Sequence, residues 1–119
     1  MANPNIAGLT DIYGKLANGI ATTSAVGIIT NAASSGKIFK INTFMVANTD
    51  GVNAADVSVQ VVNNGSAYYI AWTVSVPSDA TLVLISKDTS IYLPENSSIN
   101  IHASASNDLQ WTCSYEEIS

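Results

Sequence analysis

A chain of 119 residues has the length of one ordinary domain, and only 11% of its residues are charged, against about 25% in an average soluble protein. Its formal net charge is −5, with four lysines and no arginine, while 47% of the residues are hydrophobic. This composition excludes nucleic acid and anionic membrane surfaces as expected partners, because both require a basic stripe that four scattered lysines cannot form.

The first ten residues show no periodicity and contain Pro4 and Gly8. We therefore predict an extended N-terminal arm over residues 1–10 and a folded domain over residues 11–119. The opening residues lack the charged and apolar regions of a signal peptide, and no apolar run approaches the roughly 18 residues of a membrane-spanning helix. The single cysteine, Cys113, cannot form an internal disulfide, so the chain suits a reducing cytoplasm.

Short segments of alternating apolar and polar residues follow the arm, and turn residues separate them, as is typical of β-strands. Among the turns, Asn64-Gly65 is the strongest, because both residues tolerate the positive φ of a tight hairpin. We expect it to join one strand that ends near Val62 to another that begins near Ala67. The expected strands are 12–16, 26–30, 38–47, 56–62, 67–76, 82–85, 98–105 and 109–116.

Alternation also predicts which side of each strand is buried. In residues 67–76 it assigns Tyr68, Ile70, Trp72, Val74 and Val76 to the core and leaves the side that carries Tyr69 largely exposed. Segments 38–47 and 82–85 are apolar on both sides, which favours central or interface strands. With no helical stripe of useful length, seven to nine short strands predict an all-β, single-domain antiparallel β-sandwich of jelly-roll or immunoglobulin-like type.

The side chains that could carry out chemistry are few and dispersed. His102, the only histidine, falls on the polar side of its strand, where a solvated or interface role is favoured over catalysis or metal binding. Cys113 alternates with Trp111 and Tyr115 on an inward side, as a small buried hydrophobe would. We therefore predict a protein that is not an enzyme, with no catalytic residue, no cofactor and no metal site.

Two acidic features have simple structural interpretations. Glu116 and Glu117 are adjacent on one expected strand, so they point to opposite faces and favour protection of a terminal or edge strand over a catalytic pair. The segment from Asn48 to Asp56 is rich in oxygen ligands, but it lacks the spacing of a calcium-binding loop and favours a plain turn.

Tyr69 breaks the polar side of its strand as a single exposed ring. One ring is a weak platform for stacking a saccharide, and tyrosine is also enriched where proteins contact each other. A carbohydrate-binding or host-adhesion module therefore stays open as an alternative.

Several further segments contain strands and turns but no mechanistic motif. They are 1–6 (MANPNI), 31–42 (NAASSGKIFKIN), 46–48 (VAN), 76–82 (VPSDATL), 86–88 (SKD), 91–95 (IYLPE), 103–105 (ASA) and 113–117 (CSYEE). In these segments the chain resembles small virion structural proteins of tailed bacteriophages, particularly phages of marine cyanobacteria. The resemblance implies a virion component made in the host bacterial cytoplasm, and it transfers no catalytic residue.

Within a virion, a small acidic sandwich with a loose arm suits a capsid decoration or cement protein on the outer head surface. We expect its partners to be the major capsid protein or other virion proteins, together with further copies of itself as a homo-oligomer, for which a trimer is one arrangement. A neck, tail or fibre component is the alternative position. The residues expected at the assembly interface are Pro4, Ile6, Leu9, Tyr13 and Tyr69.

Overall fold

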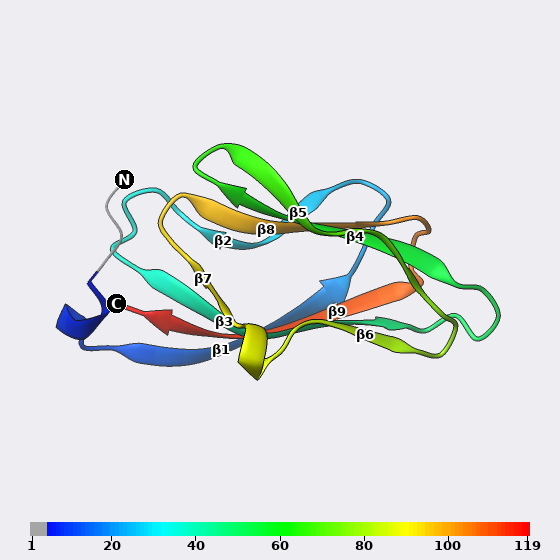
Figure 1. Cartoon of the computed structure of the whole chain (residues 1–119), viewed down its shortest axis with the longest axis horizontal. Coiled ribbons are helices and arrows are strands. Elements are labelled where there is room, and N and C mark those ends of the chain that lie inside the picture. The colour runs from blue at the N-terminus through cyan, green and yellow to red at the C-terminus, as the bar shows by residue number, and fades with distance from the viewer. Residues whose placement is uncertain (1–4) are drawn as a thin grey trace.

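In the computed structural model, which describes residues 5–119, nearly all regular structure is β-strand (Figure 1). Two short 3-10 turns, η1 (Ile6–Gly8) and η2 (Lys87–Thr89), interrupt the strands. No helix in this part of the chain is both long and apolar enough to cross a membrane. The nine strands of residues 5–119 are β1 (Ile12–Ile20), β2 (Val26–Asn31), β3 (Ile38–Asn48), β4 (Ala55–Asn63), β5 (Ser66–Val76), β6 (Thr81–Ile85), β7 (Ile91–Leu93), β8 (Ser97–Ala103) and β9 (Leu109–Ile118).

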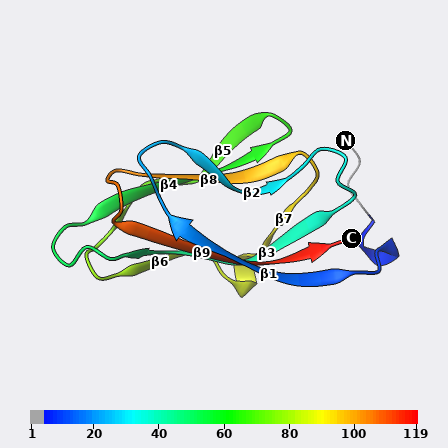
Figure 2. The same cartoon turned by 180° about the vertical axis from the view of Figure 1, so that it is seen from behind.

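The strands form two antiparallel sheets that pack face to face, as the views from the two sides show (Figures 1 and 2). The first sheet, sheet A, has the order β1-β9-β3-β6, with β7 also pairing with β3. The second, sheet B, has the order β2-β8-β4-β5. The predicted all-β antiparallel sandwich is confirmed, and its principal extents are 50 × 25 × 20 Å.

The core fills the space between the two sheets with side chains from their inner faces. Phe44, at the middle of β3, is fully buried, and its ring meets that of Trp111 on β9 edge to face, with 6.4 Å between centroids. Val57 on β4 and Ile99 on β8 close the core from the other sheet. Burial of these apolar side chains is the main stabilising contribution to the fold.

Two predictions are confirmed: the tight turn at Asn64-Gly65 and the central position of segment 38–47. Asn64 (φ 51°) and Gly65 (φ 89°) make the two-residue turn between β4 and β5, in the left-handed region that such a turn requires. β3, which contains segment 38–47, lies inside sheet A between β9 and the strands β6 and β7.

The predicted faces of β5 are wrong over its first half. Tyr68, Ile70 and Trp72 are exposed, whereas Ala71, expected on the exposed side, is buried. β5 contains two β-bulges, each of which inserts one extra residue opposite β4, so the inward and outward sides are exchanged between them, with Ala71 inward and Trp72 outward. The second bulge restores the predicted sides, and Tyr68, opposite Val61, is exposed close to the hairpin turn.

One bulge is centred on Thr73, whose φ of 47° is unusual for a β-branched residue. The Thr73 N–H donates a hydrogen bond of 2.9 Å to Oγ of Ser58. Because Ser58 is buried on the neighbouring strand β4, its hydroxyl stabilises the bulge from within the sheet.

Two further expectations are wrong in part. β9 is the terminal strand of the chain, as expected at Glu116 and Glu117, but it is not an edge strand, because it lies between β1 and β3. Segment 82–85, expected to be a central or interface strand, is not central, since it lies at the edge of sheet A as part of β6. Within the predicted extended arm, residues Ile6–Gly8 make one 3-10 turn, and Thr10 and Asp11 then donate backbone hydrogen bonds to the Ser119 carbonyl.

Replacing Phe44 by alanine is expected to lower the free energy of unfolding by about 3–5 kcal/mol, because it empties a fully buried site at the centre of the sandwich. Urea unfolding followed by circular dichroism measures the change. Val52, which is 83% exposed, provides the control, since Val52→Ala should stay within about 0.5 kcal/mol of the parent protein. Equal effects of the two substitutions would contradict the core described above.

Candidate functional site

Titratable and nucleophilic groups are dispersed over the described part of the chain. Within residues 5–119, no three His, Cys, Asp or Glu side chains come together in a way that could hold a metal ion. His102 is partly buried on the outer face of β8, opposite Ser58. Cys113 is fully buried on β9, as predicted, and burial raises the pKa of its thiol to about 11, so the thiol stays protonated at neutral pH.

The oxygen-rich segment after β3 is a hydrogen-bonded turn, as expected. Oδ1 of Asp50 accepts backbone N–H bonds from Val52 at 2.8 Å and from Asn53 at 3.2 Å. These bonds lower the pKa of the Asp50 carboxyl, and the bond from Val52 has the largest effect. The side chain of Asn48 continues the turn by donating to the carbonyls of Asn53 and Val76.

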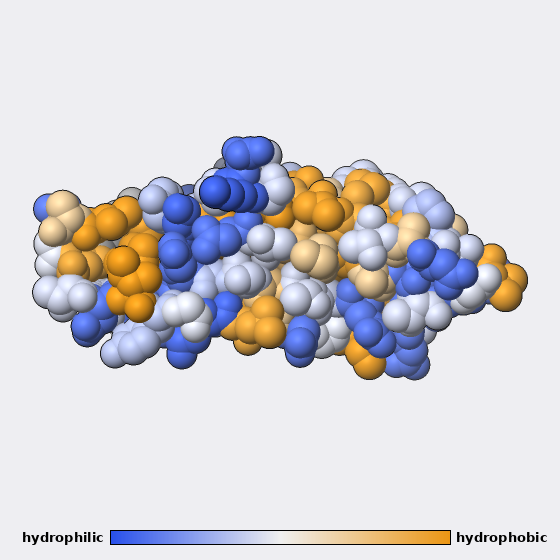
Figure 3. Space-filling model, turned by 90° about the horizontal axis from the view of Figure 1, so that it is seen from below, coloured by the Kyte–Doolittle hydropathy of each residue, from blue (hydrophilic) through white to orange (hydrophobic). Residues whose placement is uncertain are grey.

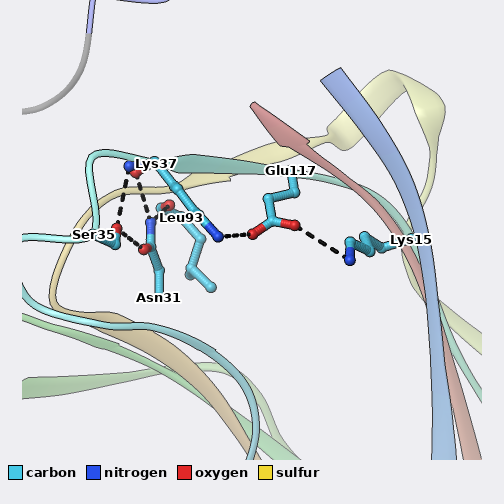
Figure 4. A network of polar contacts seen from close by, with 6 residues as sticks. All are labelled: Lys15, Asn31, Ser35, Lys37, Leu93 and Glu117. Atoms are coloured by element: carbon cyan, nitrogen blue, oxygen red, sulfur yellow. Dashed lines mark hydrogen bonds and ion pairs between the residues drawn. The ribbon is translucent and has the colours of Figure 1, made fainter. Parts of the chain in front are cut away.

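Three charged side chains meet near the C-terminal end of β9 (Figure 4). Glu117 on β9 accepts a hydrogen bond from Lys37, with 2.5 Å between Nζ and Oε1, and its other oxygen lies 3.4 Å from Nζ of Lys15 on β1. The hydrogen bond from Lys37 is the largest cause that lowers the pKa of the Glu117 carboxyl. This cluster ties β1 and the start of β3 to β9.

A buried amide lies beside this cluster. The Asn31 side chain donates to the carbonyls of Lys37 at 2.9 Å and Leu93 at 3.0 Å, and its oxygen accepts a bond from Ser35 (Figure 4). Asn31 is only 1% exposed, so these bonds satisfy a polar group that could not otherwise be buried without cost. They fix the loop that leads into β3.

The outer face of sheet A carries an apolar row along β1. Ile12, Leu16 and Ile20 are 65%, 68% and 51% exposed, and their spacing of four residues puts all three on the same side of the strand. Seen from this side, the apolar residues lie in patches separated by hydrophilic ones (Figure 3). Exposed apolar side chains grouped along one strand make this side of β1 a candidate contact surface for another molecule.

A shallow hollow of about 340 Å³ lies at the far end of this row. Gly19 leaves room for the Trp111 ring, since a Cβ atom at this position would lie 3.1 Å from it. The hollow is lined by Asn18, Gly19, Ile20, Gln110, Trp111 and Thr112.

A second exposed surface lies on β5, where the exchange of sides between the two bulges turns Trp72 outward beside the exposed Tyr69. The rings of Tyr69 and Trp72 pack edge to face, with 4.6 Å between centroids. Tyr69 lies opposite Gln60 on β4, and Gln60 in turn lies opposite Asn100 on β8. The aromatic pair therefore lies next to two amide side chains, which follow one another across the outer face of sheet B.

The structure does not bring the predicted interface residues together. Tyr13 is exposed on β1 and Tyr69 on β5, and these are edge strands of different sheets. Ile6 is exposed in η1, Leu9 is partly buried, and Pro4 lies outside the described residues. Sequence reasoning missed Ile20, because the first strand was ended at residue 16, and it placed Trp72 in the core.

Comparisons with known proteins show no family. No family model matches the chain, and no curated protein matches it. Among solved structures, the chain is similar to one from work on Bacillus endospore appendages, described as "a novel family of disulfide-linked pili". The two chains share 14% sequence identity, and the TM-score is 0.49. The match covers 90% of this chain and 85% of that chain. Similarity this remote carries no information about function.

Acidification is expected to destabilise the fold through Glu117. A carboxyl whose pKa is lowered in the folded state stabilises that state above its unfolded pKa, and this stabilisation is lost as the pH falls from about 5 through the lowered pKa. Urea midpoints measured between about pH 6 and pH 3 should therefore fall more steeply for the parent protein than for Glu117→Gln.

Glu116 is the matched control, since it neighbours Glu117 but has no ion pair within residues 5–119. Glu116→Gln should keep the steep pH dependence of the parent protein. The same pH dependence in the parent and in Glu117→Gln would contradict the assigned role of the cluster.

Proposed function

We propose that this protein is a non-enzymatic bacteriophage structural protein, a decoration or cement subunit that binds the outer surface of the capsid. The observation that carries the proposal is the position of the exposed apolar side chains. Many of them lie on the edge strands, outside the core that the two sheets enclose. Ile12, Leu16 and Ile20 on β1 are examples. The resemblance of the sequence to virion proteins of tailed phages supports the same role.

The composition of the surface also supports an assembly role. Because charged residues are few, neighbouring copies meet little electrostatic repulsion when they pack closely. On a symmetric shell, many equivalent contacts turn a weak single contact into high occupancy. The arm residues Pro4, Ile6 and Leu9, with Tyr13 and Tyr69, remain the proposed assembly-interface residues, in contact with the major capsid protein, other virion proteins or further copies of this chain.

A second function, saccharide binding, is favoured by one specific observation. The Tyr69–Trp72 pair is exposed and adjoins the amide side chains of Gln60 and Asn100 across the outer face of sheet B. Aromatic rings offer apolar faces to the C–H groups of a sugar, while amides donate and accept hydrogen bonds with its hydroxyls. This surface would suit a host-adhesion module.

The decoration role predicts that the protein coats virion heads in many copies. Quantitative mass spectrometry of purified virions, together with imaging of particles carrying a labelled copy, measures copy number and position. We expect a copy number of the same order as that of the major capsid protein, and label over the head. A few copies that purify with tails would contradict decoration and support a neck, tail or fibre component.

The saccharide role predicts that loss of either aromatic ring weakens binding on a glycan array. Trp72→Ala and Tyr69→Ala should each weaken binding by about tenfold or more, because stacking on an aromatic ring contributes on the order of 1–2 kcal/mol. Tyr92→Ala is the matched control, since Tyr92 is equally exposed but lies on β7 in the other sheet. Absence of glycan binding by the parent protein would contradict this second function.

A further inference from the structure

The strands at the sheet edges differ in how well they could accept another strand. β5 carries two bulges, and β2 has a register shift between Gly27 and Ile29. On the far side of sheet A, the edge is divided between β6, with five residues, and β7, with three. Bulges and short strands are the usual devices that prevent an edge from pairing with another chain.

β1 is neither bulged nor short, and the one charge that it carries, Lys15, is paired with Glu117. Its nine residues pair with β9 in an unbroken register, from Ile12 opposite Ile118 to Ile20 opposite Gln110. Within residues 5–119, no strand lies on its other side. β1 therefore presents a regular edge about 30 Å long, with unpaired backbone N–H and C=O groups.

We propose that β1 pairs antiparallel with β1 of a second copy of this chain, about a twofold axis that passes through Leu16. The two A sheets then form one continuous sheet across the dimer. This inference names a partner for the structural role proposed above and rests on it. An interface of this kind is isologous, since the same surface of each copy meets itself.

The residues of β1 are self-complementary in this register. Leu16 lies opposite Leu16 of the partner subunit, and Ile12 lies opposite Ile20 of the partner subunit. The three exposed apolar side chains of each copy thus form one row with those of the other on the outer face. Apolar side chains that face each other across an antiparallel pair stabilise it and shield one another from water.

The opposite side of β1 fits the same register. Tyr13 lies opposite Gly19 of the partner subunit, a position without a side chain, where the Trp111 ring of the same subunit occupies the adjacent space. No side chain at Gly19 therefore opposes the exposed Tyr13 in this register.

Charge and register exclude the neighbouring alignments. If the axis passed through Lys15, two lysines would face each other, and like charges opposite each other destabilise a strand pair. If it passed through Ala17, Leu16 would face Asn18 of the partner subunit, and the apolar row would be broken. With the axis at Leu16, Lys15 faces Ala17 of the partner subunit and keeps its ion pair with Glu117, 3.4 Å away.

Cysteine cross-linking of the full chain tests both the dimer and its register. Leu16→Cys should be cross-linked to a dimer by a short bis-maleimide, because the two Cβ atoms face each other at the axis, about 4.5–5.5 Å apart, beyond the usual Cβ–Cβ distance of a disulfide. Ile12→Cys and Ile20→Cys should cross-link with each other when mixed, but neither with itself. The buried Cys113 does not compete.

Sedimentation equilibrium tests the strength of the contact. The parent protein should be a dimer, and Leu16→Lys should raise the dimer dissociation constant about 100-fold or more, because it places two like charges at the axis. Val83→Lys is the matched control, on an exposed position of β6 at the other edge of sheet A, and should remain dimeric.

A monomeric parent protein, a trimer, or cross-links with any other pattern would overturn the proposal. A monomer whose binding to virions is lost in Leu16→Lys would show that another virion protein occupies β1, which also overturns it. The virion role is tested separately, by copy number and position on virions. Failure of the dimer proposal therefore appears in cross-linking and sedimentation, whereas failure of the virion role appears in the virion measurements.

Discussion

The unpaired backbone at the edges of two open sheets is the constraint on which the rest of this structure depends. A sandwich satisfies its interior N–H and C=O groups within each sheet, but every outermost strand leaves a row of them without a strand partner. Here β5 is bulged, β6 and β7 are short, and β1 alone among the edge strands is long and regular in its pairing. The edge strands therefore differ in whether they can pair with a strand of another chain. This difference, which the core does not determine, separates the surface at β1 from the surface at β5.

Neutral polar groups secure the ends of the sandwich in place of charges. Asn31 and Asn48 are almost completely buried, and each donates two hydrogen bonds to backbone carbonyls of separate segments. An amide can satisfy such carbonyls at any pH, whereas a buried ion would also require a counter-ion. The ion pairs of residues 5–119 join Glu117 to Lys15 and Lys37, so acid acts on a limited part of the fold.

Local patterns in the sequence predicted the strands well and the faces of β5 poorly, for a physical reason. Alternation and the Asn64-Gly65 turn depend on neighbouring residues, and both were confirmed. The bulge at Thr73 depends instead on a hydroxyl 15 residues away, that of Ser58, which no periodicity reveals. As a result Trp72 was assigned to the core although it forms part of an exposed surface, while Tyr69 is exposed, as the alternation predicted.

The two exposed surfaces can act at the same time, because they belong to different sheets. Pairing through β1 would extend sheet A and leave β5, at the edge of sheet B, uncovered by the partner's β1. A dimer would then present two copies of the Tyr69–Trp72 pair, related by the same twofold axis. Two linked sites bind a repetitive surface, whether a capsid or a glycan, more tightly than either does alone, because the second contact forms at a high effective concentration. Self-association through one edge would thus strengthen weak binding through the other.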